Sequence, residues 1–224
     1  MTPAGMHTRI DRVYAGRVQA MPGDGRPTGI FKTPVDGPVQ VGVEGITIDA
    51  QADRRVHGGP EKAVHHYPAK NLAQLRAAFP DVAAQLLPGS LGENLSTSEW
   101  DESQVCIGDV FRAGSVVLQL NQPRSPCWKI DARFGVDGMT RYVAEKGIAG
   151  WYYRVLQPGE LRAGDMLVLE QRQPDAVSLR EYWDLHAAAR PNLDAVRRVV
   201  AAPGLAPDKR ARWQQRLEWL QRHA

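Results

Sequence analysis

The chain has 224 residues, of which 43% are hydrophobic and 24% are charged, and its formal net charge is +3. These proportions are ordinary for a globular protein, and no apolar run approaches the ~20 residues that a membrane-spanning helix needs. The first 21 residues hold scattered charges and no continuous apolar core, which argues against a secretory signal. Two cysteines are too few for a disulfide framework, so we expect a reduced, cytoplasmic protein without a membrane partner.

The first three quarters of the chain predict mainly strands, separated by glycine-containing turns. Two helices interrupt them: one starts at Pro68 and ends at Pro80, and the other covers 139–146 and ends at Gly147. Many short strands with few helices predict a mainly β fold with some α, a closed or folded-over β-barrel over residues 1–172. The expected strands are 9–20, 39–43, 46–48, 63–67, 94–97, 110–113, 115–120, 151–156 and 165–170.

A small helical appendage is expected at residues 175–224, after a change of composition near Pro174. The predicted helices cover 178–189, 192–202 and 207–222, and Ser178 with Glu181 forms a capping box. Residues 190–224 contain eight basic and three acidic side chains, a net of +5. Since the whole chain carries +3, residues 1–189 carry −2, and the basic character belongs to this helical segment.

Cys127 lies in a turn that follows a predicted buried strand. Two prolines bracket Arg124 and Ser125, so strand pairing cannot continue there. Arg124 and Lys129 flank the thiol, and nearby positive charge favours the thiolate, which is both a nucleophile and a soft-metal ligand. The alternative is a buried thiol that acts as a small hydrophobic group, which is the interpretation that we favour for Cys106.

A second polar segment covers residues 54–67. Gly58 and Gly59 allow a close backbone approach, and their amides, with Arg55 and Lys62 beside them, suit a phosphate or another anion. A β-turn with a charged rim is the alternative, and this segment on its own favours it.

Three histidines follow in the same region. His65 and His66 are adjacent, so on a strand they point to opposite faces, and one of them can be a core histidine. A zinc site made of His57, His65 and Cys127 is disfavoured, because the short spacings of structural zinc sites are missing.

A third segment, residues 88–95, contains Gly92, which frees backbone amides, and then Glu93 and Asn94, which could orient the polar edge of a ligand ring. A tight turn before a strand is the alternative. The chain has no dinucleotide-binding or P-loop pattern and no CxxC. Any redox chemistry therefore needs electrons from another protein.

These segments occur together in an order that resembles a known family. The motifs are HGGPEKAVHHYP (57–68), GSLGENLST (89–97), IGDVF (107–111) and QPRSPCWKID (122–131). They resemble the MOSC domain, named for the C-terminal part of molybdenum cofactor sulfurase, and within it the bacterial YiiM-type proteins. The resemblance covers residues 29–169, and the helical tail is similar to the three-helix segment that follows the domain in that group.

The resemblance implies a MOSC-type β-barrel that binds the molybdenum cofactor (Mo-molybdopterin), a pterin dithiolene with a terminal phosphate. Cys127 stands where the family has a thiolate ligand of molybdenum, which agrees with the preference of soft sulfur for such a metal. The cofactor-binding residues that we expect are Arg55, His57, Gly58, Gly59, Lys62, Gly92, Glu93, Asn94, Arg124, Ser125 and Lys129.

Relatives in the family reduce N-hydroxylated compounds, including hydroxylamino-purines, to amines. By resemblance we expect a small N-hydroxylated substrate and electrons from an external reductase, with Cys127 on the metal and Glu93, His57 or His65 supplying protons. MOSC domains have also been described as pyridoxal phosphate binders, and no feature of this chain requires that cofactor. Lys62 as a Schiff-base lysine has no support in the sequence.

Two other functions compete with this one. A non-enzymatic carrier of the cofactor or of its sulfur would also use Cys127, because a thiolate can accept sulfur as a persulfide. Nucleic-acid binding would use Lys209, Arg210, Arg212 and Arg216 of the last helix, but a solvated face opposite an apolar stripe is favoured. The helical segment could instead dock the electron donor or form a homodimer contact.

Overall fold

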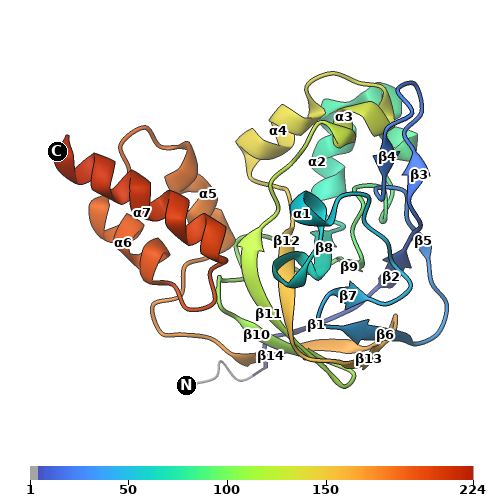
Figure 1. Cartoon of the computed structure of the whole chain (residues 1–224), viewed down its shortest axis with the longest axis horizontal. Coiled ribbons are helices and arrows are strands. Elements are labelled where there is room, and N and C mark those ends of the chain that lie inside the picture. Colours follow the sequence, from blue (N-terminus) through green and yellow to red (C-terminus); the bar gives the residue numbers. More distant parts are fainter. Residues whose placement is uncertain (1–4, 224) are drawn as a thin grey trace.

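The computed structural model describes residues 5–223 and has a mixed α/β fold built on a nine-stranded sheet (Figure 1). The sheet is antiparallel except for one parallel pair, β8 with β9. Across the sheet the order is β1 (His7–Arg9), β14 (Met166–Gln171), β10 (Val110–Ala113), β11 (Val116–Pro123), β12 (Trp151–Gln157), β8 (Val64–Pro68), β9 (Leu95–Thr97), β2 (Arg12–Ala15) and β5 (Thr33–Pro34). Two smaller sheets contain β13 (Gly159–Leu161), β6 (Val39–Gly42) and β7 (Gly45–Ile46), and β3 (Gln19–Ala20) with β4 (Pro27–Thr28).

The strand pairings do not establish the closed barrel that the sequence predicted. β1 and β5 are the two outer strands of the large sheet, and within residues 5–223 no pairing joins them. The fold is therefore mixed α/β with a large sheet and several helices, and it contains more helix than expected.

The buried apolar side chains form two clusters. The larger one involves the strands of the sheet, and the smaller one lies at one end of the sheet, beneath helices that Figure 1 shows grouped together. Leu72 and Leu75 pack there against Ile130, Met139 and other buried side chains. The helices of this end are α2 (Asn71–Ala78), the 3-10 helix η2 (Pro80–Gln85), α3 (Lys129–Phe134) and α4 (Met139–Lys146). The sequence predicted α4 with its correct bounds, but α3, which begins two residues after Cys127, was not predicted.

The three predicted C-terminal helices are confirmed as α5 (Leu179–Ala187), α6 (Leu193–Ala201) and α7 (Pro207–Arg222). Ser178 Oγ accepts a hydrogen bond from Glu181 N at 3.0 Å, which confirms the predicted N-cap of α5. Tyr182, Val199 and Trp213 belong to the same buried core as the sheet strands. The helical segment therefore shares its core with the sheet and does not form a separate one.

The single long strand predicted for residues 9–20 is wrong, because the chain changes its strand partner twice in this stretch. It leaves β14 after Arg9 and pairs with β9 from Arg12 onward. It then turns at Gly16, whose N donates to Asp49 Oδ1 at 2.9 Å. A Cβ at Gly16 would lie 2.2 Å from the carbonyl oxygen of Phe31, so only glycine allows this crossing.

We expect Gly150→Ala to destabilise the fold more than Gly135→Ala does. Both glycines have a left-handed φ, 71° and 64°, so alanine costs each about 1–2 kcal/mol. At Gly150 the added Cβ would also lie 2.3 Å from the carbonyl oxygen of His66, whereas nothing lies within 4 Å of a Cβ at Gly135. Overpacking should add about 1–3 kcal/mol at Gly150. Urea unfolding of the two variants measures the difference, and equal losses would contradict the contact.

Candidate functional site

The predicted residues meet at a cavity with a volume of about 60 Å3, open to solvent. Its wall comes from segments that are distant in sequence: the connection from β4 to β5, the loop 51–62, β8, the loop 91–94, the turn 124–129 and β12. The loop 51–62 contains the short helices α1 (Arg54–His57) and η1 (Pro60–Lys62). Eight predicted residues line the cavity: His57, Lys62, His65, Gly92, Asn94, Arg124, Cys127 and Lys129.

Five predicted residues do not line this cavity. The Arg55 side chain is 90% exposed and pairs with Asp53, the N-cap of α1. Ser125 is exposed in the turn and points instead toward Lys209, whose Nζ donates to its Oγ at 2.8 Å. The other three are Gly58, Gly59 and Glu93.

Cys127 lies at the cavity wall in the four-residue segment between β11 and Trp128. Its side chain is half-buried, and its carbonyl oxygen accepts a hydrogen bond from Thr140 Oγ1 at 3.0 Å. Arg124 N donates to Gly150 O at 3.0 Å, which fixes the other end of the turn. The thiol is thus presented to the cavity by a turn that is anchored at both ends.

Cys106 has the opposite environment, as the sequence indicated. It is buried, and burial, assisted by the charge of Asp109, raises the pKa of its thiol to about 11. Cys106 does not line the cavity, and its thiol stays protonated at neutral pH.

The cavity is strongly cationic. Lys32, Lys62, Arg124 and Lys129 line it, and none of the lining residues among positions 5–223 is acidic. Lys62 Nζ and Lys129 Nζ donate to the neutral carbonyl oxygens of Val56 and Pro27. Arg124 is 6% exposed, and its buried Nη1 has no acceptor within the described chain. A buried, unpartnered guanidinium donor beside Lys62 and Lys129, which donate only to carbonyl oxygens, favours an anionic ligand.

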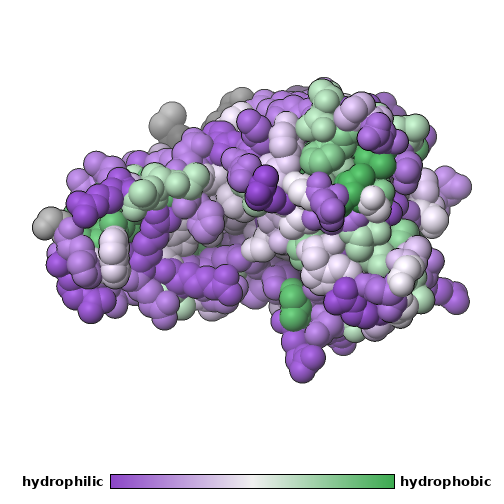
Figure 2. Space-filling model, turned by 90° about the horizontal axis from the view of Figure 1, so that it is seen from above, coloured by the Kyte–Doolittle hydropathy of each residue, from purple (hydrophilic) through white to green (hydrophobic). Residues whose placement is uncertain are grey.

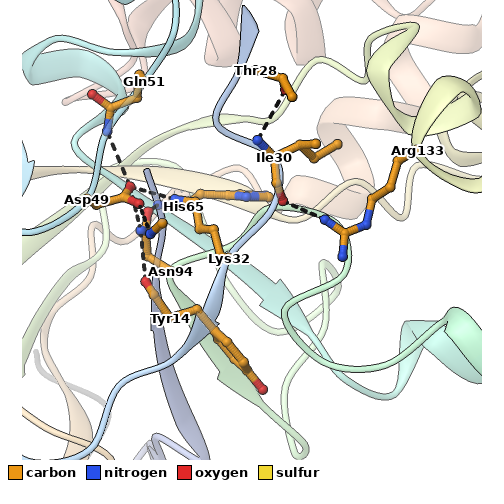
Figure 3. Close-up of polar contacts among 10 residues, drawn as sticks. Tyr14, Thr28, Ile30, Lys32, Asp49, Gln51, His65, Asn94 and Arg133 are labelled. Atoms are coloured by element: carbon orange, nitrogen blue, oxygen red, sulfur yellow. Dashed lines mark hydrogen bonds and ion pairs between the residues drawn. The ribbon is translucent and has the colours of Figure 1, made fainter. Parts of the chain in front are cut away.

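A buried ion pair supports the floor of this cavity (Figure 3). Lys32 Nζ and Asp49 Oδ2 are 2.6 Å apart, and the two side chains are 6% and 1% exposed. Asn94 Nδ2 also donates to Asp49 Oδ2, at 2.9 Å, and Asn94 Oδ1 accepts from His65 N at 3.0 Å. Asp49 therefore connects Lys32, Asn94 and β8 in one network.

Glu93 supports a loop and does not face the cavity. Its carboxylate accepts hydrogen bonds from Gly89 N at 2.5 Å and Leu91 N at 3.0 Å, and its side chain is fully buried. Burial raises the pKa of Glu93, while these amides act in the opposite direction. Leu91 and Gly92 line the cavity, so Glu93 acts by holding their loop.

Glu61 plays a similar supporting role that sequence reasoning missed. Asn121 Nδ2 donates to its carboxylate at 2.9 Å, and Arg154 Nη2 binds the same carboxylate at 2.5 Å. Gln122 Nε2 donates to the Glu61 carbonyl oxygen at 2.8 Å. These contacts tie the loop that carries His57 and Lys62 to strands β11 and β12.

The adjacent histidines point to opposite sides of β8, as predicted. His65 lines the cavity, and its buried Nε2 lacks a hydrogen-bond partner among the described residues. His66 is in the core, with its ring nitrogens 3.0 Å from Tyr153 Oη and 2.9 Å from Thr97 Oγ1. Burial lowers the pKa of both rings, to about 3 in His66, and the charge of Arg124 lowers the pKa of His65 further.

We expect His57 to stay neutral down to about pH 5. Burial, followed by the charges of Lys129 and Arg124, lowers the pKa of its ring to about 4. The unfolded chain, with a histidine pKa of about 6.5, therefore binds more protons than the folded chain as pH falls from 6.5 to 4, and folding stability falls in that window. Ring-nitrogen NMR shifts measure the pKa, and His57→Gln should weaken the loss of stability. A His57 midpoint near 6.5 would contradict the prediction.

The site contains no ready-made metal cluster of protein side chains. His57, His65 and Cys127 share the cavity, yet no three His, Cys, Asp or Glu side chains between residues 5 and 223 gather closely enough to hold an ion. A metal bound through Cys127 would take its other ligands from elsewhere.

In the described part of the chain, no helix has the length and apolar character needed to cross a membrane.

Several lining residues were not predicted from the sequence. Lys32 lies on a segment without a recognisable motif, and Tyr152, whose ring lies 5.1 Å from that of His65, comes from β12. Burial raises the pKa of Tyr152, and Arg124 acts against this shift. The remaining unpredicted residues are Thr28, Gly29, Ile30, Gln51, Ala52 and Leu91.

Comparison with known proteins agrees with the motifs. The MOSC domain matches residues 53–168. The chain is 37% identical over 194 residues to protein YiiM of Escherichia coli strain K12, covering 87% of this chain and 86% of that protein. A protein named reductase from Gibberella moniliformis is 36% identical over 163 residues, which are 72% of this chain and 29% of that protein.

Solved structures show the same relationship. The crystal structure of YiiM from Geobacillus stearothermophilus matches with a TM-score of 0.79 and 28% identity, over 94% of this chain and 99% of that one. The crystal structure of YiiM from Escherichia coli matches with a TM-score of 0.76 and 29% identity, over 96% and 92% of the two chains. The chain therefore belongs to the MOSC domain family and has a YiiM-like fold.

Proposed function

We propose that this protein is a molybdenum-cofactor-dependent oxidoreductase that reduces small N-hydroxylated compounds, of the hydroxylamino-purine type, to amines. The observation that carries the proposal is a half-buried thiol, Cys127, at the wall of a cavity with three cations, Lys62, Arg124 and Lys129, that have no acidic partner among the described residues. A soft sulfur ligand next to an anion-binding wall matches both parts of the cofactor, its metal and its phosphate. The name of the Gibberella moniliformis relative supports the redox part.

The residues present fit this cofactor. Cys127 would ligate the metal, and the unpartnered Nη1 of Arg124 would bind an anionic oxygen. Lys62 and Lys129 now donate only to backbone carbonyls, so both can turn to a phosphate at little cost. Asn94 would act by position, because its amide groups are already used by Asp49 and by the backbone of β8.

The cofactor is larger than the cavity of about 60 Å3, but the cavity is open to solvent, so part of the cofactor would extend past its mouth. The loop 51–62 forms one side of this mouth, and α1 within it has no buried residue. Glu61 holds the far end of the loop to β11 and β12. The bound cofactor would therefore lie against a loop that Glu61 anchors at its far end.

In the proposed reaction two electrons and two protons convert R–NHOH to R–NH2 and water, as the N–O bond breaks. When bound, the molybdenum cofactor would supply the electron transfer, with electrons from an external reductase. The chain itself would bind the substrate and move protons. Of the three residues proposed for proton transfer, His57 and His65 line the cavity, and Glu93 is turned to the amides of its own loop.

The test is turnover. Protein purified with cofactor supply is mixed with a chemical reductant and an N-hydroxylated purine, and the amine is quantified by chromatography. We expect amine to form with the wild type and not with Cys127→Ala. The competing carrier function predicts molybdenum bound at Cys127 without any amine above the background of the reductant, and that result would refute the proposed enzyme.

A further inference from the structure

A second, larger cavity lies between the sheet body and the helical segment, and Figure 2 shows a hollow between these two lobes. Its volume is about 290 Å3, close to the lower limit of small-molecule sites. One wall comes from the turn 123–126 and from α4, and the other from α5 and α7. It is separate from the Cys127 cavity, but the turn that carries Cys127 divides the two.

Four aromatic rings gather on the helical wall of this inter-lobe cavity. Tyr182, Trp183 and His186 come from α5, and Trp213 comes from α7. The ring centroids of Trp183 and His186 are 5.7 Å apart, and those of Tyr182 and Trp213 are 5.2 Å apart. The buried Nε1 of Trp183 has no acceptor within residues 5–223. His186 is exposed, whereas Tyr182, Trp183 and Trp213 are only 6%, 7% and 3% exposed, so this wall offers a planar ring the face of His186, and the unpartnered Trp183 Nε1 is one donor for a ring heteroatom.

The rest of the lining is cationic. Lys209, Arg212 and Arg216 line the cavity, and no acidic side chain does so in the described structure. Lys209 is 8% exposed and its Nζ donates only to the neutral Ser125 Oγ. Arg212 is exposed and makes no hydrogen bond or ion pair with the described residues. Burial lowers the pKa of Lys209, Asp208 raises it, and Arg212 lowers it, so an anion placed here would relieve an unfavourable charge.

Arg216 has a different position within the same wall. Its guanidinium lies 5.2 Å from the ring centroid of Trp213, and its Nη1 donates to the His186 carbonyl oxygen at 3.1 Å. These contacts fix Trp213 and the end of α5. Lys209 and Arg212 are therefore the two cations left for a ligand.

We propose that the inter-lobe cavity binds a nucleotide, with its planar heteroaromatic ring against His186 beside Trp183 and its phosphate on Lys209 and Arg212. Two cations suit a phosphate dianion, and the free Trp183 Nε1 suits a ring nitrogen or carbonyl. A simple anion would leave the aromatic wall unused, and an uncharged ring would leave the cations unpaired. The site does not depend on the proposed function of the Cys127 cavity.

The test uses the full chain without added molybdenum and three probes: AMP, adenosine and inorganic phosphate. Quenching of tryptophan fluorescence and calorimetry give Kd, and FMN in place of AMP distinguishes a flavin nucleotide from a purine nucleotide. We expect AMP or FMN to bind at least about tenfold more tightly than phosphate or adenosine, since ring and phosphate contacts add. Phosphate that binds as tightly as both nucleotides, or no binding of either nucleotide, would overturn the proposal.

Matched variants on α7 locate the site. Arg212→Ala should raise Kd about tenfold, whereas Arg222→Ala, an exposed arginine of the same helix outside the cavity, should leave it unchanged. Both side chains are exposed, so both variants should fold. Cys127→Ala should bind nucleotide like the wild type even though it cannot support the proposed reductase. Equal affinity of Arg212→Ala and the wild type would show that the nucleotide does not bind here.

Discussion

Cys127→Ser purified from cells with cofactor supply is expected to contain at most about a tenth of the molybdenum found in the wild type. Substitutions around a bound metal change affinity by about 10–100-fold, and among the described lining residues Cys127 is the only sulfur ligand. A serine hydroxyl is harder and stays protonated at neutral pH, so it cannot replace a thiolate. Elemental analysis per mole of protein measures the effect.

Cys106→Ser is the matched control for this substitution. It replaces the same atom type in the same chain, but Cys106 is buried, outside the cavity, and carries a thiol whose pKa is raised to about 11. We expect its molybdenum content to equal that of the wild type. If Cys127→Ser retains molybdenum in the same proportion as Cys106→Ser, the metal is not held by this thiol, and the proposed function loses its main support.

The Cys127 turn was predictable because its determinants are local. Two prolines end the strand, and Arg124 and Lys129 are two or three residues from the thiol, so all three side chains reach one cavity. The other half of the wall was not predictable. Tyr152 reaches the cavity only because β12 pairs with β8, and the sequence contains no signal for that pairing.

Motif membership alone did not separate residues that face the cavity from residues that support it. Glu93 and Asn94 are adjacent in one motif, yet Glu93 is satisfied by the amides of its own loop, while Asn94 lines the cavity. Arg55 has charge of the right sign, but it pairs with Asp53 at the start of α1. Such differences depend on which partner each polar group meets after folding, and spacing does not encode them.

The same distinction between local and distant determinants explains the fold predictions. Helices α5 and α6 were predicted because Ser178 and Asn192 cap them through side-chain bonds to residues three positions later. The break within residues 9–20 depends instead on Gly16 crossing Phe31 and bonding Asp49, which lies 33 residues away. A loosely alternating sequence could not reveal that contact.

Asp49→Asn is expected to lower the free energy of unfolding by about 3–5 kcal/mol, the cost of leaving one partner of a buried ion pair alone. Asp49 is the acidic partner of Lys32, and neither side chain is more than 6% exposed. Asparagine keeps the size but only one acceptor oxygen, so either Gly16 N, which donates to Oδ1, or Asn94 Nδ2, which donates to Oδ2, loses its acceptor, and this adds to the effect of the lost charge. Urea unfolding at pH 7 measures the loss.

Two controls separate the buried charge from other effects. Glu145→Gln breaks the pair of Arg141 with Glu145, whose side chains are 81% and 65% exposed, and should cost less than about 0.5 kcal/mol. The double variant Lys32→Met with Asp49→Asn removes the stranded cation and should recover part of the loss. A double variant less stable than Asp49→Asn would show that Lys32 is not the source of the cost.

The loss of folding stability caused by Asp49→Asn should also become smaller as pH rises. Burial lowers the pKa of Lys32, and the charge of Asp49 raises it. Because the substitution removes this charge, the pKa of Lys32 in the folded variant should be lower than in the wild type. The unfolded chain then holds its lysine proton up to about pH 10.4, whereas the folded variant releases it earlier. Between the two pKa values the unfolded state binds more protons, so stability rises with pH relative to the wild type. A loss of stability that stays constant from pH 7 to pH 10 would mean that the substitution does not change the protonation of Lys32 in the folded protein, and it would contradict this prediction.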